Sequence, residues 1–362
     1  MTLNKRQLQT FKQLTELNGV SGQEKLINKY LTSEYEKLGF KVVRDNLGGV
    51  FAYKPSKKKN AKKVLIAGHM DEVGLQVTEI NKNGLLKATA IGGLNPQTLL
   101  AHRVHVETTK GEWLPGAIDA TPPHLMSKED RGKPTQIKDM YFDFGFINDE
   151  EVREAGIKEG SQIVLDGDFE VLNNGKRLLA KAFDNRYGLI LGLDILNELK
   201  DEELDVDLYV GGTVQEEVGL RGAEVASYLI NPDLAIVLDC SPARDSSGNK
   251  NEQGQLGEGI LIRYLDRSMI AFKELLDYQI EAAEASGVKY QYYSSPGGTD
   301  AGAIHKKYAG ILTLTHCICA RNIHTCSSLI DTGDYLGAKK TLLYMIRNLS
   351  DETFEKWARS RR

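Results

Sequence analysis

Residues 206–240 read VDLYVGGTVQEEVGLRGAEVASYLINPDLAIVLDC, and their pattern decides the fold. The runs VDLYVGGTV and DLAIVLDC are apolar and rich in β-branched residues, as strands are, and AEVASYLI between them is helix-like. A strand, a helix and a second strand in this order predict a parallel βαβ unit. Glu216, Glu217 and Asp239 follow the apolar runs, at the strand ends where such a sheet presents its functional groups.

Strand-like and helix-like segments continue to alternate on both sides of this unit. KKVLIAGH at 62–69 and GILTLTH at 310–316 are apolar, strand-like runs. Helices are predicted to open after Asp184, over about 269–287 and over about 333–349. We therefore expect an α/β fold in which a mixed, largely parallel sheet is flanked by helices.

Both ends of the chain carry local signals. Apolar residues recur at helical spacing over 5–18 and 23–38, so the chain is expected to begin with two amphipathic helices. Ser21 and Glu24 match a capping box in front of the second helix. The basic end KWARSRR at 356–362 is expected to be a frayed tail.

The composition and the hydrophobic pattern of the sequence change after about residue 75. Five of the nine prolines fall between 96 and 134, and the only helix expected there is short, near 149–156. VHVETTKGEWLPGAI at 104–118 and SQIVLDGDFEVLNNGKRLLA at 161–180 alternate like half-buried strands joined by glycine turns. These features predict a β-rich domain at 75–176, inserted into an α/β parent made of 1–74 and 177–362.

Length and composition exclude some classes of function. A chain of 362 residues is long for one core and suggests two domains, and a net charge of −4 gives no argument for nucleic-acid or membrane binding. The N-terminus lacks the apolar core of a signal peptide, and no run of eighteen apolar residues predicts a membrane span. The cysteines lack C-x-x-C spacing and are expected to be reduced thiols of a cytoplasmic protein: Cys240, Cys317, Cys319 and Cys326.

Five segments end in polar residues that are typical metal ligands. They are VLIAGHMDEVG with His69, AKAFDNR with Asp184, GTVQEEVGLRG with Glu216 and Glu217, AIVLDC with Asp239, and ARNIHT with His324. Two imidazoles and three carboxylates, with one further glutamate, suit zinc, manganese or cobalt. The sequence therefore predicts a metal-dependent hydrolase whose ligands meet at one edge of the sheet.

Taken singly, each of these signals has an ordinary structural explanation. Asp184 and Asp239 also fit helix-cap or turn aspartates, and His324 also fits a buried core histidine. Asp71 lies two residues after His69, so along a strand its carboxylate could hold the imidazole and fix its tautomer. The same H-x-D pattern fits a hydrogen-bonded histidine beside a turn. The remaining histidines are predicted to be structural: His102, His105, His124, His305 and His316.

Several motifs together resemble the dinuclear metal aminopeptidases, a family that includes glutamyl aminopeptidase and the self-compartmentalising tetrahedral peptidases. The matching motifs occur in the family's order and span most of the chain: AGHMDEVG, AKAFDNR, GTVQEEVGLRGA, GGTDAGAIH and ARNIHT. The resemblance implies a zinc-peptidase-like catalytic domain and an inserted β-barrel-like domain used for oligomerisation. It also implies an assembly of dimers or of tetrahedral dodecamers built from dimers.

The resemblance assigns roles to matching residues. His69 and Asp239 are expected to bind one divalent ion, Glu217 and His324 the other, and Asp184 both. Glu216 is expected to be the general base and Asp71 the partner of His69. The implied cofactors are two ions of zinc or cobalt, with manganese as a third option, and the implied substrates are short peptides with free N-termini.

Other readings stay open at this point. A related metal amidohydrolase, acting on N-acyl amino acids or as a carboxypeptidase, shares the metal chemistry but recognises a carboxylate in place of a free amine. A two-carboxylate glycosidase and a non-catalytic metal-binding scaffold are further alternatives. Arg244, Arg263 and Arg321 could each recognise an acidic side chain, so acidic and neutral substrate preferences are both kept.

Overall fold

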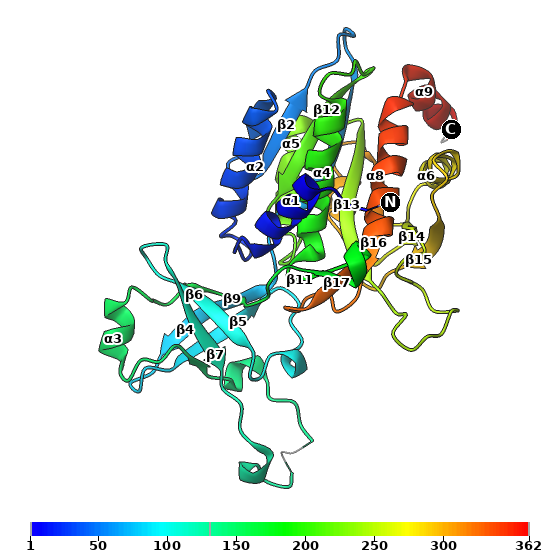
Figure 1. Ribbon diagram of the computed structural model, residues 1–362. Coiled ribbons are helices and arrows are strands. Elements are labelled where there is room, and N and C mark those ends of the chain that lie inside the picture. The colour runs from blue at the N-terminus through cyan, green and yellow to red at the C-terminus, as the bar shows by residue number, and fades with distance from the viewer. Residues whose placement is uncertain (1, 130–131, 361–362) are drawn as a thin grey trace.

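The computed structural model describes residues 2–129 and 132–360. Figure 1 shows two parts: a large sheet covered by helices, and a smaller β barrel that stands apart from it. The predicted α/β class and the separate β-rich part are both confirmed.

In the described part of the chain, eight strands form the large sheet. Their order is β1 (Lys41–Arg44), β2 (Val50–Lys54), β12 (Val206–Thr213), β3 (Lys62–His69), β13 (Leu234–Pro242), β16 (Leu312–Ala320), β14 (Ile260–Leu265) and β15 (Tyr290–Ser294). The four central strands, β12, β3, β13 and β16, run parallel to one another. Strand β2 is antiparallel to β12, and β14 is antiparallel to β16, so the sheet is mixed with a parallel centre.

Helices cover both faces of this sheet because its central strands are apolar on both sides. On one face lie α1 (Lys5–Glu16), α2 (Lys25–Lys37), α4 (Phe183–Leu199), α6 (Lys273–Ala285) and α8 (Thr332–Arg347). On the other lie α5 (Arg221–Ile230) and α7 (Ala301–Ile304). Along β3, Val64 and Ile66 enter the first core, while Leu65 and Ala67 enter the second. This alternation is the two-residue period of a strand.

Six described strands close the barrel. They are, in order around it, β4 (Gly74–Ile80), β5 (Leu86–Ile91), β8 (Phe142–Asp143), β7 (Trp113–Ile118), β6 (Arg103–Glu107) and β9 (Gln162–Leu165). The barrel has its own apolar core, which includes Leu75, Val104 and Phe142. Its connections contain α3 (Asp149–Glu154) and the short 3₁₀ helices Pro96–Thr98, Pro123–Leu125 and Ile137–Asp139.

A small third sheet lies where the chain returns from the barrel. It contains β10 (Glu170–Leu172), β11 (Arg177–Ala180) and β17 (Ser328–Asp331), with a 3₁₀ turn at Asn173–Gly175. Strands β11 and β17 pair antiparallel. Because β11 leads into Asp184 and β17 follows His324, this pairing brings two segments that are distant in sequence to the same place.

The predicted capping box at Ser21 and Glu24 is wrong. Helix α2 begins at Lys25 without a side-chain cap, because both predicted partners are engaged elsewhere. The Ser21 hydroxyl donates to the Asp71 carboxylate at 2.6 Å, and Glu24 accepts from the backbone N–H of Gln215 at 3.0 Å. A capping box exists instead at the start of α1, between Asn4 and Gln7.

The prediction of a frayed C-terminal tail is also wrong for the residues that the structure describes. Residues 351–360 form helix α9 (Asp351–Ser360), while Arg361 and Arg362 lie outside the described residues. Trp357 is 2 % exposed and packs edge-on against Tyr278 and Phe354. One buried tryptophan therefore anchors a segment that otherwise looks like a charged tail.

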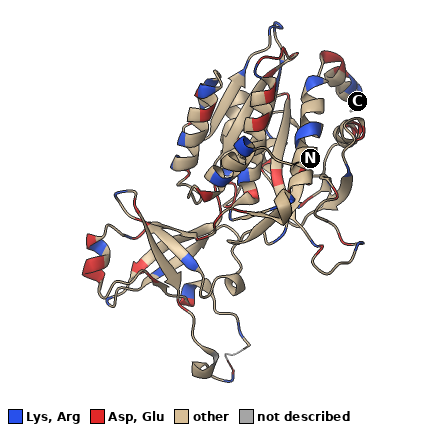
Figure 2. Ribbon diagram, viewed as in Figure 1, with Lys and Arg blue, Asp and Glu red and all other residues tan. Residues whose placement is uncertain are grey.

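The surface carries both signs of charge. Figure 2 shows basic and acidic residues interspersed over the helices, in keeping with the small net charge of −4. None of the helices in residues 2–129 and 132–360 is long and apolar enough to cross a membrane.

Candidate metal centre

The predicted site residues gather where the central strands end. Strand β3 ends at His69, directly beside Thr213 at the end of β12. Asp239 lies near the end of β13, and His324 follows β16 in the connection to β17. Parallel strands place these ends at one edge of the sheet, so the side chains of remote segments converge there.

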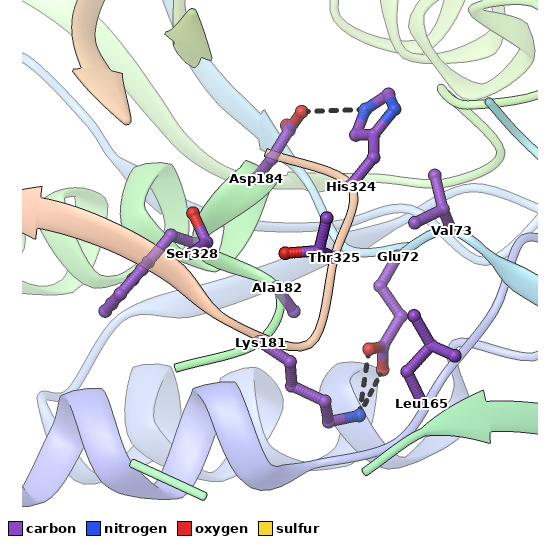
Figure 3. A pocket seen from close by; sticks show the side chains of 10 residues that line it. Glu72, Val73, Leu165, Lys181, Ala182, Asp184, His324, Thr325 and Ser328 are labelled. Carbon is purple, nitrogen blue, oxygen red and sulfur yellow. Dashed lines mark hydrogen bonds and ion pairs between the residues drawn. The ribbon is translucent and has the colours of Figure 1, made fainter. Parts of the chain in front are cut away.

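Asp184 lies between the two imidazoles. Its Oδ1 is 3.0 Å from His69 Nε2, and its Oδ2 is 3.1 Å from His324 Nε2. Figure 3 shows the contact between Asp184 and His324. The residue sits in the first turn of α4 with non-helical backbone angles, φ −83° and ψ 103°. Its carboxylate is therefore directed at the histidines and does not act as the helix cap that the sequence also allowed.

Two groups of possible metal ligands share this aspartate. One is His69, Asp184 and Asp239, and the other is Asp184, Glu217 and His324. Within each group one ligand atom per residue lies within 4.8 Å of the others. The third such group, His69 with Glu216 and Glu217, draws Glu216 to the same place.

The side chains fit divalent cations. Glu217 Oε1 is buried and makes no hydrogen bond, although it lies 3.2 Å from His324 Nε2. A buried carboxylate oxygen without a donor is costly unless a cation compensates it. Nitrogen and carboxylate donors together match zinc or similar ions. These residues can therefore hold two ions that share Asp184.

The electrostatics point the same way. Burial raises the pKa of Glu216 and of Asp239 well above their usual values, and neighbouring carboxylates add to the increase. Burial opposes charge on His69, but Glu216, Asp184 and Asp71 outweigh it and raise the pKa of the imidazole well above its usual value. Crowded acids of this kind favour binding of added positive charge.

Asp71 lies beside His69, and its carboxylate has further partners that the sequence did not predict. Because β3 ends at His69, the strand alternation does not extend to Asp71. The backbone carbonyl of Asp71 lies 3.0 Å from His69 Nδ1, and its carboxylate Oδ1 lies 3.6 Å from the same nitrogen. The carboxylate also accepts from the backbone N–H groups of Glu216 and Glu217 at 3.0 and 3.1 Å. Asp71 thus holds the loop that carries both glutamates.

Sequence reasoning missed two features of the site. Asp300 is 1 % exposed, and its Oδ2 accepts from the Thr213 hydroxyl beside the end of β3. The only sequence signal was an aspartate inside the glycine-rich run GGTDAGA. The second feature is a buried ion network around Glu72, which left no signal because its members are far apart in sequence.

The three arginines that could recognise an acidic substrate side chain differ in their partners and in their exposure. Arg263 is buried and donates from Nε to Asp266 at 2.9 Å. Arg321 donates from Nε and Nη2 to Asp245 at 2.6 and 2.8 Å. Arg244 is exposed. Two of the three therefore already have a carboxylate partner within the chain.

The other histidines and the cysteines lie outside the ligand groups. His316 is fully buried, with Nδ1 3.0 Å from Gln279 Nε2 and Nε2 2.9 Å from the carbonyl of Ala338. His102 Nδ1 lies 3.1 Å from Cys326 Sγ. All four cysteines are free, and Cys240, Cys317 and Cys319 are buried.

Comparison with known proteins gives consistent relatives. The model of the M42 glutamyl aminopeptidase family matches residues 48–341. A glutamyl aminopeptidase of Lactococcus lactis is 39 % identical over 94 % of this chain and 96 % of its own length. A lysyl aminopeptidase of Pyrococcus furiosus is 31 % identical over 95 % and 97 %.

Solved structures agree with this result. A TET aminopeptidase from a marine sediment archaeon of the Thaumarchaeota superposes with a TM-score of 0.93 at 35 % identity, covering 97 % of this chain and 99 % of that one. The TET1 peptidase of Pyrococcus horikoshii, which can assemble into a tetrahedron or a large octahedral shell, gives a TM-score of 0.85 at 29 % identity, covering 95 % and 100 %.

Proposed function

Since the chain belongs to the M42 glutamyl aminopeptidase family, we propose that it removes N-terminal residues from short peptides with two divalent metal ions as cofactors. His69 and Asp239 would hold one ion, Glu217 and His324 would hold the other, and Asp184 would contact both. The observation that carries the proposal is the position of Asp184, whose carboxylate oxygens lie 3.0 and 3.1 Å from the two imidazoles. When bound, such ions act as Lewis acids and lower the pKa of water toward neutrality.

Glu216 is the side chain available for proton transfer. Its Oε2 lies 3.9 Å from His69 Nε2, and it is absent from both ligand groups that share Asp184. In the proposed reaction its carboxylate takes a proton from the attacking water and delivers it to the leaving amine. Asp71 keeps this base in place through the backbone N–H of Glu216.

The runner-up is a metal amidohydrolase acting on N-acyl amino acids or carboxypeptidase-type substrates. It needs the same ions and the same base, so the geometry of the ligands supports both. The names of the relatives favour the aminopeptidase. The chemical difference is the substrate's N-terminus, which is a free amine in one case and acylated in the other.

The preferred N-terminal residue stays open between acidic and neutral side chains. Relatives named for glutamyl and for lysyl substrates both align over nearly the whole chain. Arg263 and Arg321 are paired with Asp266 and Asp245, so neither offers a free cation to an acidic side chain. For the metal we propose zinc or cobalt, with manganese as the third option.

The chain is proposed to form a homo-oligomer through the β-rich insert at 75–176. The closed barrel with its own core supports this role, because such a unit can present a contact surface without disturbing the site. A tetrahedral dodecamer of dimers is the proposed assembly, supported by the TET relatives.

The test is hydrolysis of free and N-acetylated aminoacyl p-nitroanilides, before and after chelation and after addition of zinc, cobalt or manganese. We expect chelator-sensitive cleavage of the free amines alone, and the panel will rank acidic against neutral residues. Cleavage of acetylated substrates would transfer the proposal to the amidohydrolase. Activity that survives complete metal removal would contradict both.

A further inference from the structure

A buried ion network joins the segment that carries Asp184 to the segment that carries His69. The Lys181 ammonium donates to both carboxylate oxygens of Glu72 at 2.9 and 2.8 Å, and Arg186 Nη2 lies 3.3 Å from Glu72 Oε1. Figure 3 shows the Lys181–Glu72 pair near Asp184. Glu72 and Lys181 are each 4 % exposed and Arg186 is fully buried.

The network is completed by the end of α1 and the loop that follows it. Lys181 donates to Asn18 Oδ1 at 2.7 Å, and Glu72 accepts from the Gly19 N–H at 3.1 Å. Arg186 donates to the carbonyls of Leu14 and Leu17 at 2.8 and 2.7 Å. Burying three charges is expensive, and replacement by apolar residues is often neutral or stabilising. A contribution to stability alone is therefore a weak explanation for this arrangement.

The two cations bracket a stretch of backbone that departs from regular helical angles. Ala182 has φ +56°, in the left-handed region that non-glycine residues rarely adopt. Asp184 and Asn185, although at the start of α4, also depart from helical angles. Such a conformation persists only where its surroundings determine it. Lys181 precedes this stretch and Arg186 follows it, and Glu72 contacts both.

Glu72 directly follows Asp71, and the two carboxylates act on different segments. Asp71 accepts the N–H groups of Glu216 and Glu217, whereas Glu72 accepts from Lys181 and Arg186. One dipeptide just beyond β3 therefore ties both ligand-bearing segments to the strand that ends in His69.

We propose that Glu72 is a positioning residue: through Lys181 and Arg186 it sets the place of Asp184 relative to His69, and so sets the affinity for the shared metal ions. This inference rests on the proposed metal centre. Residues that orient metal ligands in this indirect way typically change affinity by about 10- to 100-fold when they are replaced.

Asp194 supplies a matched control. Like Glu72 it is a buried carboxylate, 2 % exposed, but it lies within α4. It accepts from Gln7 Nε2 at 2.5 Å and from the Tyr335 hydroxyl at 2.7 Å. Its partners lie on α1 and α8, and none of them carries a proposed ligand. Loss of Asp194 should therefore cost stability without moving Asp184.

The experiment is a calorimetric titration of the metal-free full-length protein with Co²⁺, with the visible absorption of bound Co²⁺ as a report on coordination and urea unfolding of the metal-free protein as a report on stability. The variants are Glu72→Gln, Lys181→Gln and Asp194→Asn. We expect all three to be less stable, but only Glu72→Gln and Lys181→Gln to bind Co²⁺ about 10- to 100-fold more weakly and with a changed spectrum.

Co²⁺ binding by folded Glu72→Gln that equals the wild type would overturn the inference and leave the proposed function intact. Equal weakening by Asp194→Asn would overturn it too, because a merely structural role would then suffice. Should Glu72→Gln fail to fold, Lys181→Gln decides by the same criterion. Wild-type protein that binds no Co²⁺ would overturn the proposed function, and the inference with it.

Discussion

Glu216 and Glu217 are neighbours in the chain, yet they have different surroundings. Glu217 Oε1 lies 3.2 Å from His324 Nε2, and Glu216 Oε2 lies 3.9 Å from His69 Nε2. Strand β12 ends at Thr213 and Gln215 has φ +55°, so the strand alternation stops before both glutamates. Because the alternation stops, both carboxylates can face one site, as the proposed division between metal binding and proton transfer requires.

This difference makes Glu216→Gln informative. The amide keeps the shape of the side chain but cannot accept the proton, so we expect turnover to fall about 10²- to 10⁴-fold with metal content unchanged. Turnover of a free aminoacyl p-nitroanilide and the metal content of the purified protein check both parts. The comparison variant is Glu217→Gln, which should lose metal as well as turnover. Metal loss in Glu216→Gln would make Glu216 a ligand and leave the base unassigned.

His316 gives a prediction about pH at the same scale. Burial lowers the pKa of this imidazole from 6.5 to about 4 in the folded protein, although its hydrogen bond to the Ala338 carbonyl acts in the opposite direction. A lowered folded pKa means that the neutral ring stabilises the fold above pH 6.5, and that this stability is lost as pH falls toward 4. The free energy of unfolding should drop by up to about 3 kcal/mol over that window from this residue.

Urea unfolding of the wild type and of His316→Gln at several pH values measures this contribution as a difference. The variant lacks the titrating group, so its stability should fall less steeply between pH 6.5 and 4. Parallel curves for the two proteins would show that another group controls the acid sensitivity.

At the scale of elements, two features could be predicted from the sequence: the parallel strands of the sheet and the polar residues at their ends. The alternation around 206–240 anticipated the parallel centre of the sheet, and the apolar runs anticipated where the polar residues would meet. The geometry places His69, Asp184, Glu217, Asp239 and His324 together, while their roles as ligands stay a prediction. Local pattern suffices here because parallel strands send their carboxyl ends to one edge.

The features that were missed depend on partners far away in the chain. Ser21 was expected to cap α2, but Asp71, fifty residues away, takes its hydroxyl. The Glu72–Lys181 pair joins residues 109 apart, and a buried ion pair has no periodicity. Asp71 does contact His69, but its backbone carbonyl, at 3.0 Å from Nδ1, lies closer than its carboxylate, at 3.6 Å, because β3 ends at His69. Pairings of this kind follow from packing, which a single sequence does not display.

Helix α9 gives a prediction for an element that the sequence suggested was frayed. Trp357→Ala removes the side chain that packs against Tyr278 and Phe354, so we expect a loss of about 3 kcal/mol in the free energy of unfolding. Figure 1 places α9 far from β11 and β17, so the catalytic rate should not change. Lys356→Ala, an exposed neighbour, is the control and should leave stability within about 0.5 kcal/mol. Equal stability of Trp357→Ala and wild type would mean that the helix contributes nothing.

At the scale of the whole molecule, the barrel and the large sheet have separate apolar cores. The barrel core and the two larger cores of the large sheet are formed by different residues, so the surface of the barrel can change without altering the edge of the sheet that carries the candidate site. The site still depends on the junction, because His324 Nδ1 lies 2.9 Å from the Gly93 carbonyl of the chain that leaves β5. Subunit contacts on the barrel surface would therefore leave the site undisturbed as long as this connecting segment keeps its position.

The proposed assembly predicts a mass well above that of one chain in light scattering. On the barrel side, Leu125 and Ile147 are 70 % and 74 % exposed, more than most large apolar residues. If subunits meet there, Leu125→Asp with Ile147→Asp should shift the mass toward the monomer, because buried charges oppose association. Ile270→Asp is the control, since Ile270 is 80 % exposed but belongs to the large-sheet part, where it bridges to Leu265 at the end of β14. A barrel variant with unchanged mass would place the subunit contacts elsewhere, and a monomeric wild type would refute the assembly.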